Sequence, residues 1–222
     1  MTRLLLLGAT GRTGVAILRQ LSEHKKIQVT AAVRNPSDAS RLPKTKELFQ
    51  TVTIDIDDIS SLRNAASHAD IVVNAIRLRG DVSPTAWIEL DTRIRESVDD
   101  MEGRLIITVG GAGSLHLPNG GRICQDPSFP KRTLPRGIAQ ARLRDYLQET
   151  PPLDSWAYLI PPPAYIPMGL RTGNYNRWKP SNDESKFLGS SISYDDFSSA
   201  VWDAIEKRWT GVHLIGGQES YT

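Results

Sequence analysis

One segment near the start of the chain restricts its fold more than any other. It runs from Arg3 to Gly14 and reads RLLLLGATGRTG. The four consecutive leucines are too few for a helix of their own and suit a strand that is covered on both faces. Three glycines at three-residue spacing follow, and apolar residues then recur at a helical period as far as Leu21. The segment therefore predicts a buried parallel strand, a tight turn and an amphipathic helix.

The glycine turn has the chemistry to bind a diphosphate. Glycine lacks a Cβ, so backbone N–H groups can approach an anion closely, and the partial positive charge at a helix N-terminus favours the same anion. The alternative is an ordinary glycine-containing turn between a strand and a helix. The strand before the glycines and the helix after them favour nucleotide binding. We expect cofactor contacts at Gly8, Thr10, Gly11, Arg12, Thr13 and Gly14.

Strand and helix patterns alternate along the rest of the chain. Strands are predicted at 27–33, 51–56, 70–76, 104–109, 156–160 and 212–215, and helices at 57–66, 84–101, 138–147 and from Tyr194. Such alternation is typical of an α/β fold, a doubly wound parallel sheet with helices on both faces. No break in composition marks a second domain, so we expect one domain over 1–222. Segments 117–136 and 161–193 are expected to form substrate-side loops.

The residue after the second strand indicates which nicotinamide dinucleotide binds. An NAD-specific domain places an acidic side chain about 20 residues beyond the glycine turn, where it accepts from the ribose 2′-hydroxyl. This chain has Arg34 there. An arginine pairs with a 2′-phosphate instead, so NADP(H) is favoured over NAD(H). The alternative is that Arg34 is only a solvated residue at a strand end.

Four strings of sequence resemble one known group. They are GATGRTG (8–14), VGGAGSL (109–115), GLRTGNY (169–175) and SISYDDFSSAV (191–201). The chain resembles the extended and atypical short-chain dehydrogenase/reductases, and in particular their NmrA-like, NAD(P)H-binding branch. In outline it is similar to the biliverdin reductase B and flavin reductase group. The resemblance implies a Rossmann-type fold.

The resemblance also implies further cofactor contacts at the strand ends. Asp55 and Ile56 would flank the adenine; Asn74, Ala75 and Ile76 would pass beneath the nicotinamide ribose; Pro162 would face the nicotinamide. The alternative for these small residues is simple packing. Gly110 and Gly111 follow the fifth strand, at the sheet edge where ligands of such folds bind, and are expected to let the backbone approach the cofactor.

The catalytic residues are less clearly indicated. Reductases of the larger superfamily use a tyrosine and a lysine four residues later, on the helix after the fifth strand. Here that helix has Tyr146 followed by Thr150, whereas the string Tyr175–Lys179 falls after the sixth strand. The usual proton relay is therefore predicted to be absent. Ser114, His116 and Tyr165 remain as candidates to orient or protonate an acceptor.

Three functions stay open at this point. The first is an NADPH-dependent reductase that passes hydride to a flavin, a quinone or a conjugated carbonyl. The second is a non-catalytic NADP(H)-binding sensor that reports redox state to a partner, as NmrA-like regulators do. The third is a non-redox isomerase or cyclase on the same fold. Tyr165, Met168, Tyr175 and Trp178 are expected to wall an aromatic pocket for the first, with core packing as the alternative.

Composition excludes several classes of partner. Charged residues make up 23% of the chain and the net charge is only +2, which does not favour nucleic acid or a membrane surface. No apolar segment approaches the roughly 18 residues that span a bilayer. Cys124 is the one cysteine, so a reducing cytoplasm is expected and Cys124 itself is expected to be inert. We expect a small aromatic or conjugated acceptor, a monomer or homodimer, and no metal site.

Overall fold

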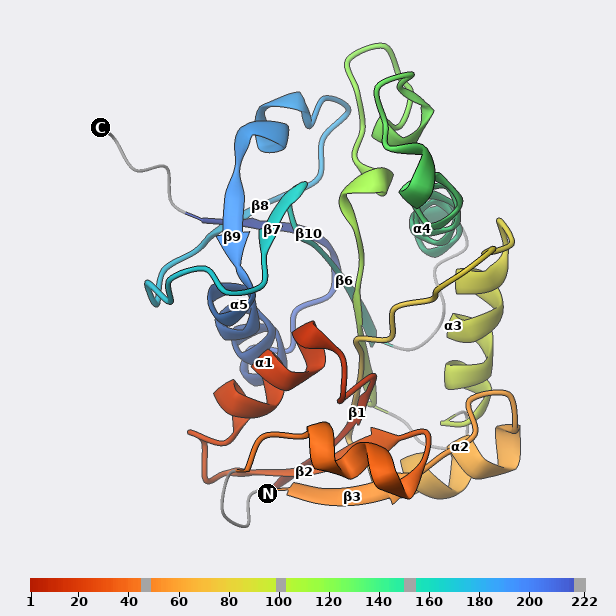
Figure 1. The fold of residues 1–222 in the computed structure, drawn as a ribbon, viewed down its shortest axis with the longest axis vertical. Helices are drawn as coiled ribbons and strands as arrows, with labels where there is room; N and C mark the ends of the chain where they lie inside the picture. The colour runs from red at the N-terminus through yellow and green to blue at the C-terminus, as the bar shows by residue number, and fades with distance from the viewer. Residues whose placement is uncertain (45–48, 99–102, 150–154, 218–222) are drawn as a thin grey trace.

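A mostly parallel sheet forms the centre of the molecule (Figure 1). The computed structural model describes residues 1–44, 49–98, 103–149 and 155–217. The sheet has eight strands in the order β3-β2-β1-β4-β5-β6-β10-β8, and β8 alone runs antiparallel to its neighbour. The strands are β1 (Thr2–Leu7), β2 (Ile27–Val33), β3 (Phe49–Thr53), β4 (Ile71–Asn74), β5 (Leu105–Val109), β6 (Ser155–Ile160), β8 (Asn176–Trp178) and β10 (Gly211–Gly216). This is the Rossmann-type arrangement that the sequence predicts.

Helices cover both faces of the sheet (Figure 1). Strand β1 shows why its sequence is a continuous apolar run: Leu4 and Leu6 belong to one hydrophobic cluster, and Leu5 and Leu7 to the other. The first cluster lies against α1 (Arg12–Leu21) and α5 (Tyr194–Glu206). The second lies against α2 (Ile59–Ala66), α3 (Ala86–Glu96) and α4 (Leu134–Glu149). Burial on both faces therefore leaves no solvent side that would require alternate polar residues.

Several predicted boundaries are wrong by a few residues. Strand β3 spans Phe49–Thr53 instead of 51–56, so Asp55 and Ile56 lie beyond its end. Strand β4 is shorter than 70–76, and α3 spans Ala86–Glu96, with Ser97 as its C-cap, instead of 84–101. Helix α4 begins at Leu134, four residues before the predicted start, so the loop predicted at 117–136 ends earlier. Turn chemistry decides such ends, and periodicity locates them only coarsely.

The segment at 161–193 contains regular structure that the sequence analysis missed. Besides β8 it holds β7 (Ala164–Ile166) and β9 (Ser191–Ser193), which pair with each other in a small parallel sheet. The bound predicted for α5 is confirmed: Ser193 is its N-cap, and the Ser193 hydroxyl accepts from the Asp196 N–H at 3.0 Å. Among the described residues, no helix is long and apolar enough to cross a membrane, and no group of three or more metal-binding side chains is gathered.

The strand order reverses beside β1, and this fixes the place where ligands bind in such folds. Strand β2 pairs on one side of β1 and β4 on the other, all parallel. The chain leaves β1 and β4 at the same edge, and the Ala75 N–H donates to the Leu7 carbonyl at 3.0 Å. The crevice beyond the carboxyl ends of the strands at this switch point is therefore the place to look for a site.

Candidate functional site

The glycine turn folds tightly against the end of β4. Gly8 has a φ of +75°, and a Cβ on it would lie 2.6 Å from the carbonyl carbon of Ala75. A Cβ on Gly14 would lie 2.2 Å from the Gly8 oxygen. Two of the three glycines are thus required by the turn itself, because any side chain there would collide with backbone. The turn remains narrow and free of side-chain bulk next to β4.

The N-terminus of α1 has no side-chain cap. Its N-cap is Gly11, which has no side chain to cap the helix, and the first turn contains no acidic residue. The N–H groups of Arg12, Thr13 and Gly14 precede the first intrahelical hydrogen bond, which Val15 donates to the Gly11 carbonyl at 2.8 Å. Such N–H groups need an acceptor from outside the helix. A diphosphate fits this requirement in charge and in hydrogen bonding.

Asn74, at the end of β4, provides a second sign of an absent acceptor. The residue is fully buried, and its Oδ1 accepts from the Ile76 N–H at 3.2 Å. Its Nδ2 has no hydrogen-bond partner within the described parts of the chain. A buried donor without an acceptor costs free energy, so Asn74 suits a ligand that accepts at this position. The residues present therefore fit a dinucleotide.

Basic side chains surround the crevice on the β2 side. Arg34 is exposed immediately after β2, and Arg12 is exposed in the first turn of α1. Sequence reasoning missed Arg41, which donates to the Thr10 carbonyl and to Asp38, each at 3.2 Å. Its signal was only a basic residue seven positions after Arg34. Arg41 thereby places a further positive charge against the glycine turn.

Asp55 and Ile56 lie in the turn between β3 and α2. The Asp55 carboxylate accepts from the Asp57 N–H at 3.0 Å, and the Asp55 N–H donates to the Ser61 hydroxyl at 3.0 Å. Asp55 is exposed and Ile56 is half-buried. The turn is thus held by its own hydrogen bonds, and the contact of these two residues with adenine stays a prediction. So does that of Pro162, which is buried just after β6.

The glycines after β5 pack against the protein itself. A Cβ on Gly110 would lie 2.5 Å from the Tyr158 ring, and one on Gly111 would lie 2.1 Å from the Gln140 side chain. These glycines therefore let the loop approach β6 and α4, a reason that the sequence analysis did not consider. Their contact with a cofactor stays a prediction.

Ser114 follows these glycines and is fully buried. Its hydroxyl donates to the Gly111 carbonyl at 2.8 Å, while its own carbonyl accepts from Arg122 at 2.6 Å and Arg144 at 2.8 Å. In this arrangement the Ser114 side chain stabilises its own turn. Orientation of an acceptor by Ser114 would require the hydroxyl to exchange this partner, and that role remains a prediction.

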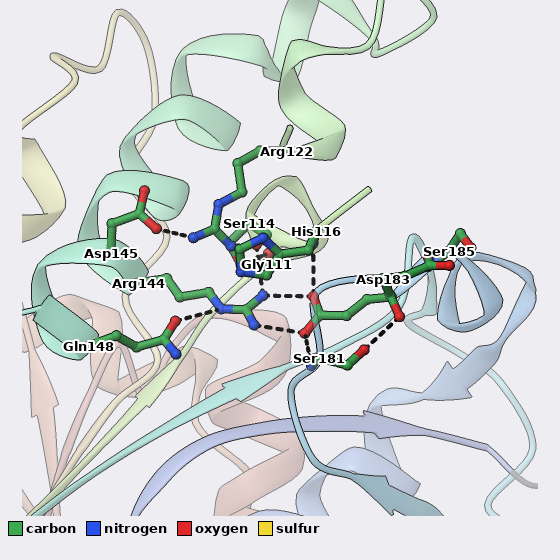
Figure 2. A network of polar contacts seen from close by, with 11 residues as sticks. Gly111, Ser114, His116, Arg122, Arg144, Asp145, Gln148, Ser181, Asp183 and Ser185 are labelled. Atoms are coloured by element: carbon green, nitrogen blue, oxygen red, sulfur yellow. Dashed lines mark hydrogen bonds and ion pairs between the residues drawn. The ribbon is translucent and has the colours of Figure 1, made fainter. Parts of the chain in front are cut away.

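A buried ion pair holds this loop to the segment before β9 (Figure 2). Arg144 and Glu184 lie on different elements 40 residues apart, and neither side chain is exposed by more than 1%. The two guanidinium nitrogens of Arg144 donate to the two Glu184 oxygens at 2.8 and 2.7 Å. Glu184 also accepts from the N–H groups of His116 at 2.9 Å and Ser181 at 3.2 Å. No sequence pattern pointed to this pair.

The ion pair affects the chemistry of His116. Burial lowers the pKa of the His116 imidazole, and the charges of Arg122 and Arg144 lower it further, while Glu184 opposes them only in part. The imidazole is therefore neutral near pH 7. A neutral imidazole is a weak acid, so His116 would protonate an acceptor better in mildly acidic solution.

Tyr165 is positioned at the other side of the crevice, on β7. Its hydroxyl lies 3.2 Å from the Thr13 hydroxyl at the start of α1, and its ring packs against Tyr194 and Phe197. Burial raises the pKa of Tyr165 above its ordinary value, so the phenol keeps its proton. Within the described residues, no hydrogen bond or ring contact joins Tyr165 to Ser114 or His116. The three candidates therefore form two groups.

The predicted aromatic pocket is wrong. Its members face different neighbours: the Trp178 ring packs against Phe187, and the Tyr175 ring lies near Trp209. Met168 is 96% exposed. These side chains separate because β7 and β8 belong to different sheets, which the sequence analysis did not anticipate.

The Tyr175–Lys179 string does not resemble a proton relay in three dimensions. Tyr175 immediately precedes β8, and its hydroxyl donates to the Asp203 carboxylate of α5. Burial and Asp203 raise the pKa of Tyr175, which is the opposite of activation. Tyr175 and Lys179 lie on either side of β8 and not on a helix, so the string lacks the geometry of the usual helical pair.

Comparisons with known proteins agree with this geometry. The sequence profile described as NAD(P)H-binding matches residues 8–208. The uncharacterized protein YwnB of Bacillus subtilis (strain 168) is 30% identical over 206 residues, covering 90% of this chain and 91% of YwnB.

Solved structures share the fold over the whole length. A putative NADH-flavin reductase from Streptococcus pneumoniae superposes with a TM-score of 0.81 at 22% identity, covering 98% of this chain and 100% of the other. A putative epimerase from Bacteroides thetaiotaomicron superposes with a TM-score of 0.83 at 24% identity, covering 100% and 99%. These likenesses concern the fold.

Proposed function

Because the chain belongs to the family of NAD(P)H-binding proteins, we propose that it is an oxidoreductase that uses NADPH to reduce a flavin, a quinone or a conjugated carbonyl. The observation that carries the proposal is the uncapped N-terminus of α1 beside the buried, unpartnered Nδ2 of Asn74. When bound there, the nicotinamide supplies a hydride, and the protein supplies binding and orientation.

The preference for NADPH is supported by charge. Arg34 and Arg41 lie beyond β2. Arg34 stands where an NAD-specific protein has an acidic residue that accepts from the ribose hydroxyls. Asp38, the nearest acidic side chain in this segment, is engaged by Arg41 at 3.2 Å. A 2′-phosphate would gain charge-assisted hydrogen bonds from the arginines.

The type of acceptor is supported by the weakness of the available acids. His116 is neutral near pH 7, and the Tyr165 phenol is held by Thr13 with a raised pKa. Neither group resembles an activated proton relay. A flavin, quinone or conjugated carbonyl needs less acid catalysis than an isolated carbonyl, because the negative charge that follows hydride transfer is delocalised. The S. pneumoniae protein, which shares the fold, carries the name of a flavin reductase.

Three apolar side chains that follow Tyr165 in the chain are exposed. Ile166, Met168 and Leu170 are exposed by 42%, 96% and 82%, in a protein whose other large apolar side chains are mostly buried. Several exposed apolar side chains in one short segment are typical of ligand or partner contacts, so this segment is a candidate to contact the acceptor.

A cofactor titration tests the first part of the proposal. NADPH is expected to bind at least about tenfold more tightly than NADH, because a charge-assisted phosphate contact contributes roughly 1.5–3 kcal/mol. Arg34→Ala should remove most of that difference. Arg19→Ala is the matched control, since Arg19 is an exposed arginine at the far end of α1. Equal affinities for the two cofactors in the parent protein would refute the role of Arg34.

A turnover assay tests the second part. The protein is expected to oxidise NADPH when offered flavins or quinones, and the reaction is followed by absorbance at 340 nm without oxygen.

The second candidate, a non-catalytic NADP(H) sensor, is favoured by one observation: Ser114 is buried and Tyr165 lies in a separate group. Tight NADPH binding without turnover across a broad acceptor panel would place the sensor first.

A further inference from the structure

Four arginines gather on the β4 side of the crevice. Arg77 and Arg79 are exposed in the segment after β4, Arg132 is exposed just before α4, and Arg136 is half-buried in the first turn of α4. Leu78, between the first two, packs against the hydrophobic cluster that includes residues of α4. The charges of Arg77, Arg132 and Arg79 all act on the Arg136 guanidinium, in addition to the effect of its burial, and lower its pKa.

The described part of the chain pairs no carboxylate with these arginines. Within the described residues, none of the four arginines takes part in a hydrogen bond or an ion pair with another side chain. By contrast, Arg122, Arg144 and Arg171 each contact a carboxylate. The first turn of α4 contains no acidic residue, and its helix dipole adds positive charge at the same end. Like charges held close together repel one another, and an anion among them would relieve the repulsion felt by the half-buried Arg136.

The cluster is separate from the site expected for the 2′-phosphate of the cofactor. Arg34 follows β2, whereas Arg77 follows β4, and β1 lies between these two strands. An anion at the cluster would therefore belong to a second ligand beside the dinucleotide. Because the cluster carries four charges, a phosphate monoester, with almost two negative charges at pH 7, matches it better than a single carboxylate.

We propose that Arg77, Arg79, Arg132 and Arg136 bind the phosphate of a phosphorylated acceptor. The inference rests on the proposed reductase function and narrows its substrate class. It predicts a preference between two flavins that differ only in a phosphate: flavin mononucleotide is the better acceptor and riboflavin the poorer one. The guanidinium groups position the acceptor and take no part in hydride transfer.

The test compares these two flavins in binding and in turnover. Flavin fluorescence quenching in the presence of NADP+ should give an affinity for flavin mononucleotide at least about tenfold above that for riboflavin. Arg136→Gln should remove most of this difference and raise KM for flavin mononucleotide by a similar factor, with kcat changed less than threefold. Inorganic phosphate should compete in the parent and not in the variant.

Two controls accompany the test. Arg142→Gln changes an exposed arginine of the same helix and should leave both flavins unaffected. The Arg136→Gln protein should unfold at the same temperature as the parent or higher, because the substitution relieves repulsion among like charges. NADPH affinity should also stay within twofold of the parent, since the cluster is separate from the cofactor phosphates.

Failure of the phosphate site and failure of the proposed reductase function give different results. Equal affinity for both flavins, or an equal effect of Arg136→Gln on both, would overturn the phosphate site. A fall in NADPH affinity equal to the fall for flavin mononucleotide would also overturn it, by assigning the cluster to the cofactor. Phosphate-dependent flavin binding without turnover would support the site while refuting the reductase.

Discussion

The buried Arg144–Glu184 pair allows the sharpest prediction about stability. Glu184→Gln removes one negative charge and leaves the Arg144 guanidinium buried without a counter-ion. Breaking a buried pair in this way costs about 3–5 kcal/mol, because the remaining charge is no longer compensated. For a chain of this size 1 kcal/mol corresponds to roughly 2–4 °C, so the midpoint of thermal unfolding should fall by about 6–20 °C.

A double variant separates the charge from the packing. Arg144→Met combined with Glu184→Gln removes both charges, and the glutamine oxygen can still accept from the His116 or Ser181 N–H. Since a buried pair replaced by neutral groups is often nearly neutral in stability, the double variant should be more stable than Glu184→Gln alone. Urea unfolding at pH 7.5 gives the free energies needed for the cycle.

The exposed pair of Arg171 and Glu23 supplies the matched control. Its N–O distance is also 2.7 Å, but the side chains are 44% and 48% exposed. Glu23→Gln should therefore cost no more than about 1 kcal/mol. The reasoning is refuted if Glu184→Gln costs as little as this control. It is also refuted if the double variant loses as much stability as Glu184→Gln and Arg144→Met, measured singly, lose together.

The same pair predicts a dependence on pH. Burial by itself would raise the pKa of Glu184, but hydrogen bonds and charge from Arg144 outweigh it, and the net pKa lies below the ordinary value. The stability that the carboxylate contributes is therefore fully present above the ordinary carboxyl pKa and is lost as pH falls through the lowered native value. The difference between the parent and Glu184→Gln should shrink in acid, measured by urea unfolding at descending pH.

Three further predictions concern other parts of the molecule. Tyr175→Phe should leave any reductase activity within a few-fold of the parent, and a hundredfold loss in kcat/KM would restore that tyrosine as a catalytic candidate. Gly14→Ala should lower both the unfolding temperature and NADPH affinity, because a Cβ there meets backbone at 2.2 Å, whereas Gly189→Ala has open space and should change neither. Burial and Arg177 lower the pKa of His213, so the imidazole stays neutral in the native protein. Stability is therefore lost as pH falls below the ordinary histidine pKa, because the unfolded chain then binds a proton that the native protein does not. Urea unfolding at descending pH should show a smaller loss in His213→Gln.

The sequence by itself determined the strand, turn and helix at residues 3–21, since each depends on neighbouring residues. Four leucines buried on both faces, a glycine whose turn requires a positive φ, and a helical apolar period are all local features. Strand alternation then predicted a parallel sheet with helices on both faces, because right-handed crossovers leave few other topologies. The order of the strands came only from the tertiary structure.

Tertiary structure alone decided the contacts between distant residues. Arg144 and Glu184 meet only because α4 and the segment before β9 pack together, and nothing in either local sequence encodes the other. The glycines after β5 contact Tyr158 and Gln140 for the same reason. The candidates Ser114 and Tyr165 lie on different elements, the turn after β5 and strand β7. Local sequence sets backbone geometry, but the neighbours that a side chain acquires depend on how the whole chain folds.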